Sequence, residues 1–391
     1  MGKKKIAIIE LYGHSEVLYV LFKLLENDFE LTVFTTQEIH LDAKDYFGTT
    51  LNNWQIKPSN ISIEDFIQER LVLLDSQNLI LFITLISSIR FFSKMNFRPL
   101  TIAVIHNVNT SFNFDNSIWV DKSSIQNYTF DVIKFLRSKI RREVFFKHKL
   151  LQKINYISFS SKNLSIYAKS ISPKFQDKII EPLPFSFFEE AKIGESESQI
   201  IISISGRVDN RLRDYEVILN TLKEIIPFNK KKIILQLLGS TNRSYGEKLV
   251  REIEDLENDN FKLVYFEKLL SQKEFDYFLK RTDFMILPSK RHKKFGIIKE
   301  EYGKSTISGG LNEIVRFGIP TLLSDSYKTE TKFEPLISTF RDQQELLEKL
   351  NDWIEHSRYL EIKNTALPKL EKINEENTRT KLVNRIEKLL K

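Results

Sequence analysis

Short apolar segments alternate with segments of helical periodicity along the whole sequence. Residues 5–12 and 29–36 have the composition of buried strands, and residues 16–25 between them repeat apolar side chains at helical spacing. The first half continues with an expected helix at 63–74, expected strands at 79–85, 101–106 and 156–160, and a segment with two prolines at 179–185 that resembles the end of a unit. Strands separated by helices pair in parallel through crossover connections. The chain is therefore predicted to be an α/β protein with helices on both faces of its sheets.

The alternation starts again after a polar break at 194–198, Gly-Glu-Ser-Glu-Ser. The second half has expected strands at 200–205, 232–238, 261–266 and 284–287, and expected helices at 215–226, 245–256 and 274–279. A chain of 391 residues is long enough for two domains. We expect a Rossmann-like domain at 1–190, a second at 191–372 and a helical segment at 373–391. Because parallel sheets bind ligands outside the carboxyl ends of their strands, we expect a ligand cleft between two such domains.

Composition narrows the class of protein. Hydrophobic residues make up 41% and charged residues 28%, which is typical of a globular protein. The absence of cysteine excludes disulfides and thiolate metal sites. The start of the chain is interpreted as a first strand rather than a signal peptide, and no segment approaches the ~18 apolar residues of a membrane span, so a cytoplasmic location is expected. The net charge of +7 favours an anionic partner such as a nucleotide, a nucleic acid or an anionic membrane.

A phosphate site is predicted around Ser308, Gly309 and Gly310. These small residues precede an apolar periodic run at 311–317, and a glycine stop and a β-type run at 321–323 follow. Open backbone N–H groups and the positive end of the helix dipole favour a phosphate at such a helix start. Glu313, one turn into the helix, is placed to accept hydrogen bonds from sugar hydroxyls. The alternative interpretation is an ordinary capped helix.

Three arginines follow the first expected strand of the second half. Arg207, Arg211 and Arg213 lie on a strand-to-helix loop, where arginines can bind phosphate oxygens through two hydrogen bonds each. A solvated basic loop is the alternative.

These segments, taken together, resemble the donor-binding half of GT-B glycosyltransferases, especially the bacterial family-4-like (group 1) enzymes. The resemblance is carried by SGRVDNRLRDY at 205–215, LPS at 287–289 and YGKSTISGGLNEIVRFGIPTLLSD at 302–325, which come in the family's order. It implies two Rossmann-like domains and a donor that is a nucleotide-diphosphate sugar of the UDP or GDP type. It also implies that the donor is held by Arg207, Arg211, Arg213, Lys304, the backbone of Ser308, Gly309 and Gly310, and, through the ribose, Glu313. Enzymes of this fold commonly need no metal, and no metal site is expected here.

The sequence departs from the family pattern at one carboxylate. Ser305 stands where the family has a glutamate eight residues before Glu313. Glu300 and Glu301 lie slightly upstream and could replace it. The segment 290–299 is expected to be a long basic loop. The sugar and the stereochemistry of transfer therefore stay open.

Two histidines are candidate general bases. His14 follows the first strand, and His106 ends another strand. Histidine ionises near neutral pH, so either side chain could accept the proton of an acceptor hydroxyl. Glu16 could orient His14, although it is expected to point elsewhere if both lie on a helix, because residues two apart do not share a helix face. The alternatives are a solvated helix-start residue for His14 and a hydrogen-bonded strand-end residue for His106. Asp75 and Asp115 are weaker candidates.

The segment 131–154 is the most basic part of the chain. It is expected to be one amphipathic helix with apolar residues at helical spacing and eight basic residues, among them Arg141 and Arg142. Such a helix could lie on an anionic membrane, or it could pack its apolar face on the domain with its charges in water.

The predicted function is transfer of a sugar from a nucleotide-diphosphate sugar to an acceptor hydroxyl, in bacterial surface glycan or glycoconjugate synthesis. The acceptor would be a glycan, a lipid-linked molecule or a protein-linked molecule, and the final helix is expected to return to the first domain. Two alternatives stay open: an epimerase or phosphorylase on the same fold, and a non-catalytic basic module that binds membrane or nucleic acid. Basic and aromatic residues interleave little outside 131–154, so nucleic acid is not expected.

Overall fold

The computed structural model describes residues 2–48, 53–86, 88–120, 125–184, 186–189, 199–330 and 333–391. The chain divides into two compact units: unit 1 comprises Met1–Phe185, Lys294–Ile307 and Glu376–Lys391, and unit 2 comprises Ser186–Lys293 and Ser308–Glu375. The predicted polar break at 194–198 lies outside the described residues. The boundaries at 190 and 372 stay predictions, and each unit is described here by itself.

Unit 1 contains a parallel six-stranded sheet. Its strand order is β3 (Trp54–Lys57), β2 (Glu30–Thr36), β1 (Lys5–Glu10), β4 (Leu79–Phe82), β5 (Leu100–Ile105) and β6 (Tyr156–Phe159). Its helices are α1 (Ser15–Leu25), α2 (Gln37–Phe47), α3 (Ile63–Glu69), α4 (Leu71–Asp75), α5 (Ile89–Phe92), α6 (Val108–Phe112), α7 (Ile125–Ile140), α8 (Glu143–Lys153), α9 (Lys162–Ile171) and α16 (Glu375–Leu389). The central strands are apolar on both faces because helices cover both.

Unit 2 repeats the same architecture. Its sheet has the order β14 (Ile337–Phe340), β13 (Thr321–Ser324), β10 (Phe284–Leu287), β7 (Gln199–Ile204), β8 (Lys232–Ser240) and β9 (Phe261–Phe266), all parallel. Its helices are α10 (Tyr215–Ile225), α11 (Ser244–Glu254), α12 (Gln272–Leu279), α13 (Gly310–Phe317), α14 (Gln343–His356) and α15 (Arg358–Leu370). The α/β fold with two Rossmann-like sheets is therefore confirmed.

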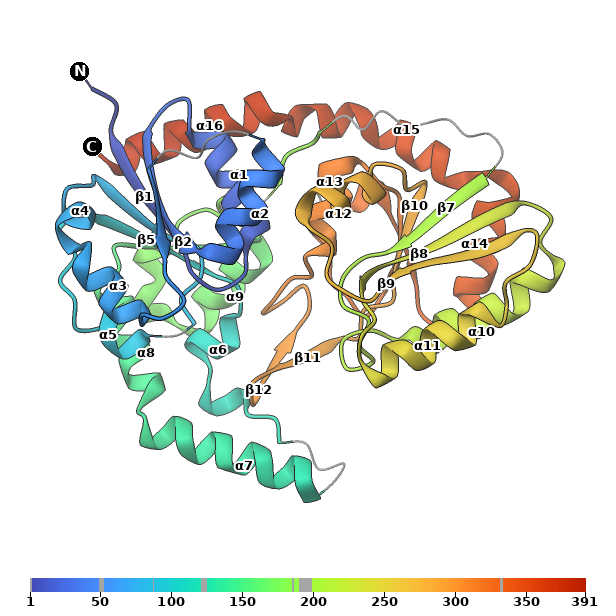
Figure 1. Cartoon of the computed structure of the whole chain (residues 1–391), viewed down its shortest axis with the longest axis horizontal. Helices are drawn as coiled ribbons and strands as arrows, with labels where there is room; N and C mark the ends of the chain where they lie inside the picture. The colour runs from blue at the N-terminus through green and yellow to red at the C-terminus, as the bar shows by residue number, and fades with distance from the viewer. Residues whose placement is uncertain are drawn as a thin grey trace. The chain divides into compact units, whose positions relative to one another are not determined.

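Both sheets have a strand order that reverses once. When the strands of each unit are counted in chain order, both sheets read 3-2-1-4-5-6. The reversal lies between β1 and β4 in unit 1 and between β7 and β10 in unit 2. Strands β7 and β10 are labelled in Figure 1. Ligands of such sheets bind at this switch point, outside the carboxyl ends of the strands. Each unit thus has one edge where functional side chains are expected.

Several expected elements differ from the observed ones. The helix expected at 63–74 is two helices, α3 and α4, because Arg70 leaves the helical conformation with φ −108° and ψ 15°. The segment expected as one helix at 131–154 is also two, α7 and α8, separated at Arg142, which has the left-handed φ of 52°. The expected basic loop at 290–299 contains a two-stranded hairpin, β11 (His292–Phe295) and β12 (Ile298–Glu301).

The final helix contacts unit 1. Arg379 on α16 donates to Asp28 (Nε to Oδ2, 2.9 Å), and Arg385 donates to the Pro182 carbonyl at 2.7 Å. Leu382 and Ile386 on the same helix are buried. The C-terminal residues therefore complete the domain in which the chain begins. Within the described part of the chain, no helix is both long enough and apolar enough to cross a membrane.

Candidate functional site

The switch point of unit 2 is a place of unusually close backbone packing. Gly206 follows β7 with φ 85°, and Gly239 lies at the end of β8. A Cβ on Gly239 would lie 2.1 Å from the carbonyl oxygen of Gly206, so no larger residue fits there without moving backbone. A Cβ on Gly206 would lie 2.4 Å from Nη2 of Arg213. The glycines therefore let the loop after β7 approach the sheet edge and leave room for the Arg213 side chain.

Arg213 is the predicted arginine that the structure buries. It is 7% exposed, and its Nη1 has no hydrogen-bond partner among the described residues. Its loop is fixed to the segment after β10: Asp214 N–H donates to the Pro288 carbonyl at 2.7 Å, and Lys290 N–H donates to the Leu212 carbonyl at 3.1 Å. The two sequence motifs at 205–215 and 287–289 are thus neighbours in space. A buried guanidinium with an unused donor is suited to an anion.

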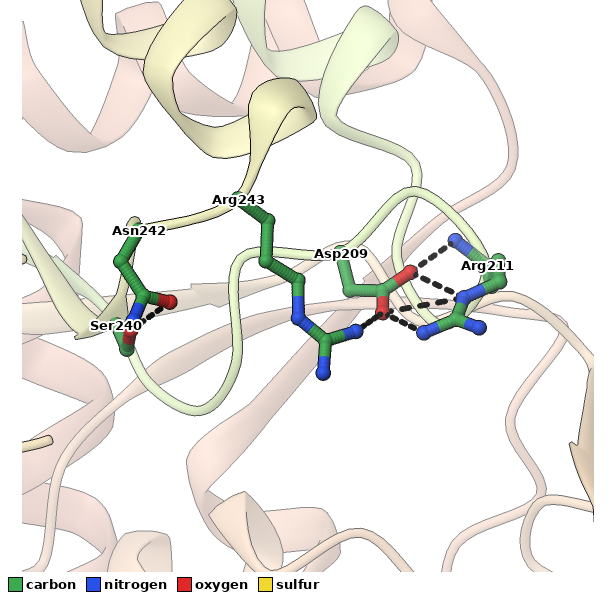
Figure 2. A network of polar contacts seen from close by, with 5 residues as sticks. All are labelled: Asp209, Arg211, Ser240, Asn242 and Arg243. Carbon is green, nitrogen blue, oxygen red and sulfur yellow. Dashed lines mark hydrogen bonds and ion pairs between the residues drawn. The ribbon is translucent and has the colours of Figure 1, made fainter. Parts of the chain in front are cut away.

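Asp209 pairs with one arginine of this loop and with one arginine of the loop after β8, and the sequence analysis missed it. Its carboxylate is 5% exposed and accepts from Arg211 (Nη2 to Oδ2, 2.5 Å; Nε to Oδ1, 2.9 Å) and from Arg243 (Nη1 to Oδ2, 3.4 Å), as Figure 2 shows. The hydrogen bonds from Arg211 hold the pKa of Asp209 below its usual value. Arg243 follows β8, so the rule that selects loops after strand ends would have found it. Arg207 is exposed on the same loop.

Helix α13 begins at the same edge. A Cβ on Gly310 would lie 2.9 Å from Ser205 Oγ, which places the helix start directly against the end of β7. The N–H groups of a first helical turn have no acceptor within the helix. The Ser308 N–H already donates to the Tyr327 hydroxyl at 2.9 Å, so the amides of Gly309 and Gly310 are the better donors for a ligand. Glu313 is 7% exposed in the first turn of the helix.

The far end of α13 has a structural role. Arg316 is 6% exposed and donates to Asp276 on α12 (Nη1 to Oδ1, 2.9 Å) and to Glu189 (Nε to Oε1, 3.1 Å). These buried ion pairs fix the helix axis and thereby the position of its N-terminal turn. All eight residues of α13 are buried, so Glu313 is held rigidly rather than displayed on the surface.

The remaining residues of the predicted donor site belong to unit 1. Lys304 Nζ lies 3.4 Å from Glu301 Oε2 and over the ring of Tyr167. Ser305 is fully buried, and its hydroxyl accepts from the Glu301 N–H at 2.8 Å. Glu300 is fully buried and accepts from the Thr110 N–H at 2.8 Å and the Thr110 hydroxyl at 2.7 Å. Glu300 therefore caps the start of α6. Burial raises its pKa, while these hydrogen bonds oppose the rise.

The switch point of unit 1 is organised by a buried carboxylate. Glu10 is fully buried at the end of β1 and accepts from the Gly13 N–H at 3.0 Å and from the Thr84 hydroxyl after β4 at 2.5 Å. Gly13 has φ 149°, which lets the chain turn sharply before α1. Glu10 thus ties the loop after β1 to the loop after β4. The sequence analysis did not identify Glu10 as a site residue because it ends an apolar segment that was assigned to a strand.

The two candidate histidines stack on each other at this edge. The rings of His14 and His106 are 4.0 Å apart between centroids and 10° from parallel. His14 Nδ1 lies 3.0 Å from Glu16 Oε1, so the expectation that Glu16 points away was wrong; the capping position of His14, outside the helix proper, brings the two side chains together. His106 Nε2 donates to the Ile83 carbonyl at 2.8 Å. These bonds place the proton of a neutral ring on Nδ1 of His14 and on Nε2 of His106.

The weaker carboxylate candidates are in ordinary ion pairs. Asp75 lies 3.5 Å from Arg98, and Asp115 lies 2.5 Å from Lys139. Neither lies in the cluster that contains Glu10 and the two histidines. Among the described residues, no group of three or more His, Asp or Glu side chains is placed to hold a metal ion.

Comparisons with solved structures identify the fold. HepE of Anabaena, solved in complex with UDP and glucose, superposes with a TM-score of 0.61 over 98% of this chain and 100% of its own, at 10% identity. A protein described as a UDP-N-acetylglucosamine 2-epimerase from Listeria monocytogenes gives 0.59 over 99% and 96%, at 11% identity. WaaG, a glycosyltransferase involved in lipopolysaccharide biosynthesis, gives 0.57 over 96% and 98%, at 10% identity. No protein-family model and no curated protein sequence matches the chain.

The chain therefore has the GT-B fold, as the resemblance predicted. At about 10% identity the likeness establishes architecture and leaves chemistry to the residues themselves. The similar structures include both sugar transfer and sugar-nucleotide epimerisation in their descriptions, so the fold alone does not choose between these activities.

Proposed function

We propose that this protein is a glycosyltransferase that moves a sugar from a nucleotide-diphosphate sugar of the UDP or GDP type to an acceptor hydroxyl. The observation that carries the proposal is the switch point of unit 2. There a buried guanidinium with an unused donor, a glycine-lined loop and the first turn of α13 converge on one sheet edge. Two phosphates in a row suit this combination of cation, amides and helix dipole.

The donor would be held by groups of complementary charge. Positive charge for the diphosphate would come from Arg213 and Arg207. Further positive charge would come from Arg211 and Arg243, which form ion pairs with Asp209. The amides of Gly309 and Gly310 approach the diphosphate from the helix side, and Glu313 accepts from the ribose hydroxyls. These fixed cations and dipoles would stabilise the diphosphate as it leaves, without a metal ion.

The acceptor would be activated in unit 1. His14, oriented through Nδ1 by Glu16, presents Nε2 as its basic nitrogen, and the stacked ring of His106 fixes the plane of the imidazole. In the proposed step, Nε2 takes the hydroxyl proton while the acceptor oxygen bonds to the anomeric carbon. The bond from that carbon to the diphosphate breaks, and its electron pair leaves with the diphosphate. We propose that this occurs on the cytoplasmic side of a bacterial cell in glycan or glycoconjugate synthesis.

Epimerisation of the donor is the second candidate, because one of the similar structures is described as an epimerase. That chemistry needs acid and base carboxylates beside the sugar. Glu10 is fully buried and accepts hydrogen bonds from Tyr12, Gly13 and Thr84, which makes it a structural carboxylate. Conversion of a nucleotide sugar to an isomer of equal mass in the absence of acceptor would favour this candidate over transfer.

A thermal-shift panel of nucleotide diphosphates and nucleotide sugars tests the proposal. A ligand that binds only the folded state raises the melting temperature by mass action. We expect a shift with one nucleotide that Arg213→Gln and Glu313→Gln each reduce, because each loses a contact worth about 1.5–3 kcal/mol to a charged ligand. Arg251→Gln, an exposed arginine on α11, is the matched control and should keep the full shift. If every nucleotide leaves the melting temperature unchanged, the donor site is wrongly assigned.

A further inference from the structure

Unit 1 contains a cavity that the proposed transfer does not yet use. It measures about 740 Å³, which is within the range of sites for small organic ligands. Its floor is formed by residues after β4 and β5, including Thr84 and His106. Its walls are α7, α8 and the hairpin β11–β12. The cavity therefore starts at the candidate base and extends away from it under two helices.

The hairpin that closes one wall is fastened to unit 1. Lys294 on β11 forms an ion pair with the buried Asp131 on α7. The Trp119 N–H donates to the Ile297 carbonyl at 2.7 Å. These contacts make the segment 294–307 part of the cavity wall, although residues of unit 2 separate it in sequence from the rest of unit 1 on both sides.

Positive charge predominates around the cavity. Five basic side chains line it against one carboxylate, that of Glu143; they are Arg90, Lys134, Arg137, Arg141 and Lys147. Ser138 is 7% exposed, lines the cavity, and its hydroxyl has no hydrogen-bond partner among the described residues. A cluster of cations with an unused hydroxyl is the chemistry that binds a phosphate.

The positive charge of Lys147 is destabilised by burial in this cavity wall. Its Nζ donates to the Thr110 carbonyl at 3.1 Å, and burial lowers its pKa to about 8 although Glu300 and Glu143 attract its charge. A bound anion would offset this desolvation.

Part of the cavity lining is apolar. Leu85, Ile89, Val144, Phe146, Phe295 and Ile297 contribute hydrocarbon surface beside the cations. Hydrocarbon next to a phosphate-binding cluster fits an amphiphile better than a free sugar phosphate, because burial of alkyl carbons adds to affinity.

Helix α7 is oriented with its apolar side outward. At about 100° per residue, Lys134, Arg137, Ser138 and Arg141 share one side of the helix, and the opposite side carries the apolar residues. Ile125 is 87% exposed, Leu136 is 53% exposed and Ile140 is 80% exposed. Figure 1 shows α7 extending away from the sheet of unit 1. The alternative in which the apolar residues of 131–154 pack on the domain fits Leu151 of α8, which is buried. It does not fit the exposed Ile133, Leu136 and Ile140 of α7. Such an outward stripe on a basic helix is suited to the surface of an anionic bilayer.

We propose that the cavity binds the phosphate-bearing end of an acceptor lipid, and that α7 is the element along which this lipid enters from an anionic membrane. The phosphate lies among Arg137, Arg141, Lys147 and the Ser138 hydroxyl, and the first alkyl carbons lie against the apolar walls. The acceptor hydroxyl is then directed towards His106 and His14. This inference names the acceptor class for the proposed transferase and depends on that function only in calling the lipid an acceptor.

Binding of decyl phosphate to the full chain, measured by calorimetry without any nucleotide, tests the cavity. We expect decyl phosphate to bind, inorganic phosphate to bind at least tenfold more weakly, and decanol to show no binding. Arg141→Gln should weaken decyl phosphate by roughly 10–100-fold, since it removes a charge-assisted contact. Arg142→Gln, the neighbouring arginine outside the cavity lining, is the matched control and should bind normally. Ser138→Ala should weaken binding less than Arg141→Gln does.

Each other result overturns part of the assignment. Equal losses in Arg141→Gln and Arg142→Gln would mean general surface attraction instead of a site. Equal binding of decyl phosphate and inorganic phosphate would remove the lipid. No binding of decyl phosphate would remove the cavity as an anion site. If the protein binds decyl phosphate but no nucleotide raises its melting temperature, the proposed transferase function is wrong and the assignment of this cavity stands.

Vesicle flotation tests the outward stripe. We expect the protein to bind vesicles that contain anionic lipid, and Ile133→Ser to reduce this binding. Ile166→Ser is the control, because Ile133 and Ile166 are both 56% exposed and Ile166 lies on α9. A dimer in sedimentation that Ile133→Ser dissociates would show that the stripe binds a second copy and would overturn the membrane assignment.

Discussion

The two units share one strand order and differ in what stands at the switch point. In unit 1 the strand ends carry a buried carboxylate, Glu10, and two stacked imidazoles, His14 and His106. In unit 2 they carry closely packed glycines and a buried guanidinium, Arg213. An imidazole can accept a proton, and a buried guanidinium can hold negative charge. The same topology thus presents different chemistry, because the loops after the strands are free to vary while the sheet is not.

The difference also concerns shape. Gly239 and Gly206 allow close packing of backbone at the sheet edge of unit 2. Unit 1 has side chains at the equivalent edge and a cavity behind them. The proposed donor site therefore belongs to an edge of close backbone packing in unit 2, and the proposed base belongs to an edge of unit 1 that lies next to a cavity.

Removal of the proposed base in unit 1 should have the largest effect, a loss of turnover. His14→Ala should lower turnover by about 10²–10⁴-fold, the usual contribution of general acid–base catalysis, with donor affinity unchanged. His356→Ala, an exposed histidine on α14, is the control. Steady-state kinetics with a saturating donor measures the effect. Full activity in His14→Ala would remove it as the base and leave His106 as the candidate.

A methyl group at the close contact between Gly239 and Gly206 in unit 2 should have the second largest effect. Gly239→Ala puts a methyl group 2.1 Å from the Gly206 carbonyl oxygen, and the resulting overpacking should destabilise the fold by about 2–3 kcal/mol. Gly309→Ala has no atom within 4 Å of its new methyl and should change stability little. Urea unfolding of both variants measures the contrast. Equal stability of the two would mean that the loop after β7 is less closely packed than described.

Removal of the Asp209 carboxylate, which pairs with Arg211 and Arg243, should have a smaller effect on stability. Asp209→Asn should destabilise the protein by about 1–2 kcal/mol at neutral pH, because it removes charge-assisted hydrogen bonds. The pKa of Asp209 is lowered in the folded protein, so its stabilisation is present above the unfolded pKa and is lost as pH falls through the folded pKa. The difference between wild type and variant in urea unfolding should therefore narrow as the pH is lowered towards 3. A difference that is independent of pH would exclude an ionic role.

The smallest expected effect concerns Lys147 in the cavity. Its folded pKa of about 8 lies below the unfolded value of 10.5, so the unfolded chain binds more protons between these values. The stability of the wild type should therefore gain about 1 kcal/mol from this group when the pH rises from 8 to 9. Lys147→Met should lack this gain, and Lys149→Met, an exposed neighbour, should keep it. Saturating decyl phosphate should shift the effect to higher pH if the phosphate lies beside Lys147.

The strand and helix alternation was sufficient to predict two Rossmann-like sheets, because apolar periodicity reports local burial. β9 and β10 have the bounds that the sequence indicated, and most other elements differ by a few residues. The helix expected at 131–154 was wrong in one respect that periodicity cannot show. The helix breaks at Arg142, which has a left-handed backbone conformation. The side-chain pattern does not predict this conformation.

The candidate donor residues could be named from motifs, since loops after strands have a known place in parallel sheets. Which of the three arginines is buried could not be named. Arg213 is buried and Arg207 is exposed because the loop folds back on Pro288 and Lys290, which lie more than seventy residues later in the chain. Asp209 and Glu10 were missed partly for the same reason, since one partner of each, Arg243 and Thr84, comes from the loop after another strand.

The sequence by itself determined the α/β class, the repeated halves and the loops that carry charge, because these depend on composition and on neighbours a few residues apart. Only the tertiary structure decided which of those loops meet. It stacked His14 on His106, joined the segment 294–307 to unit 1, and turned the basic side of α7 inward over a cavity. Contacts of this kind depend on the packing of distant segments, and packing has no local signature in a single chain.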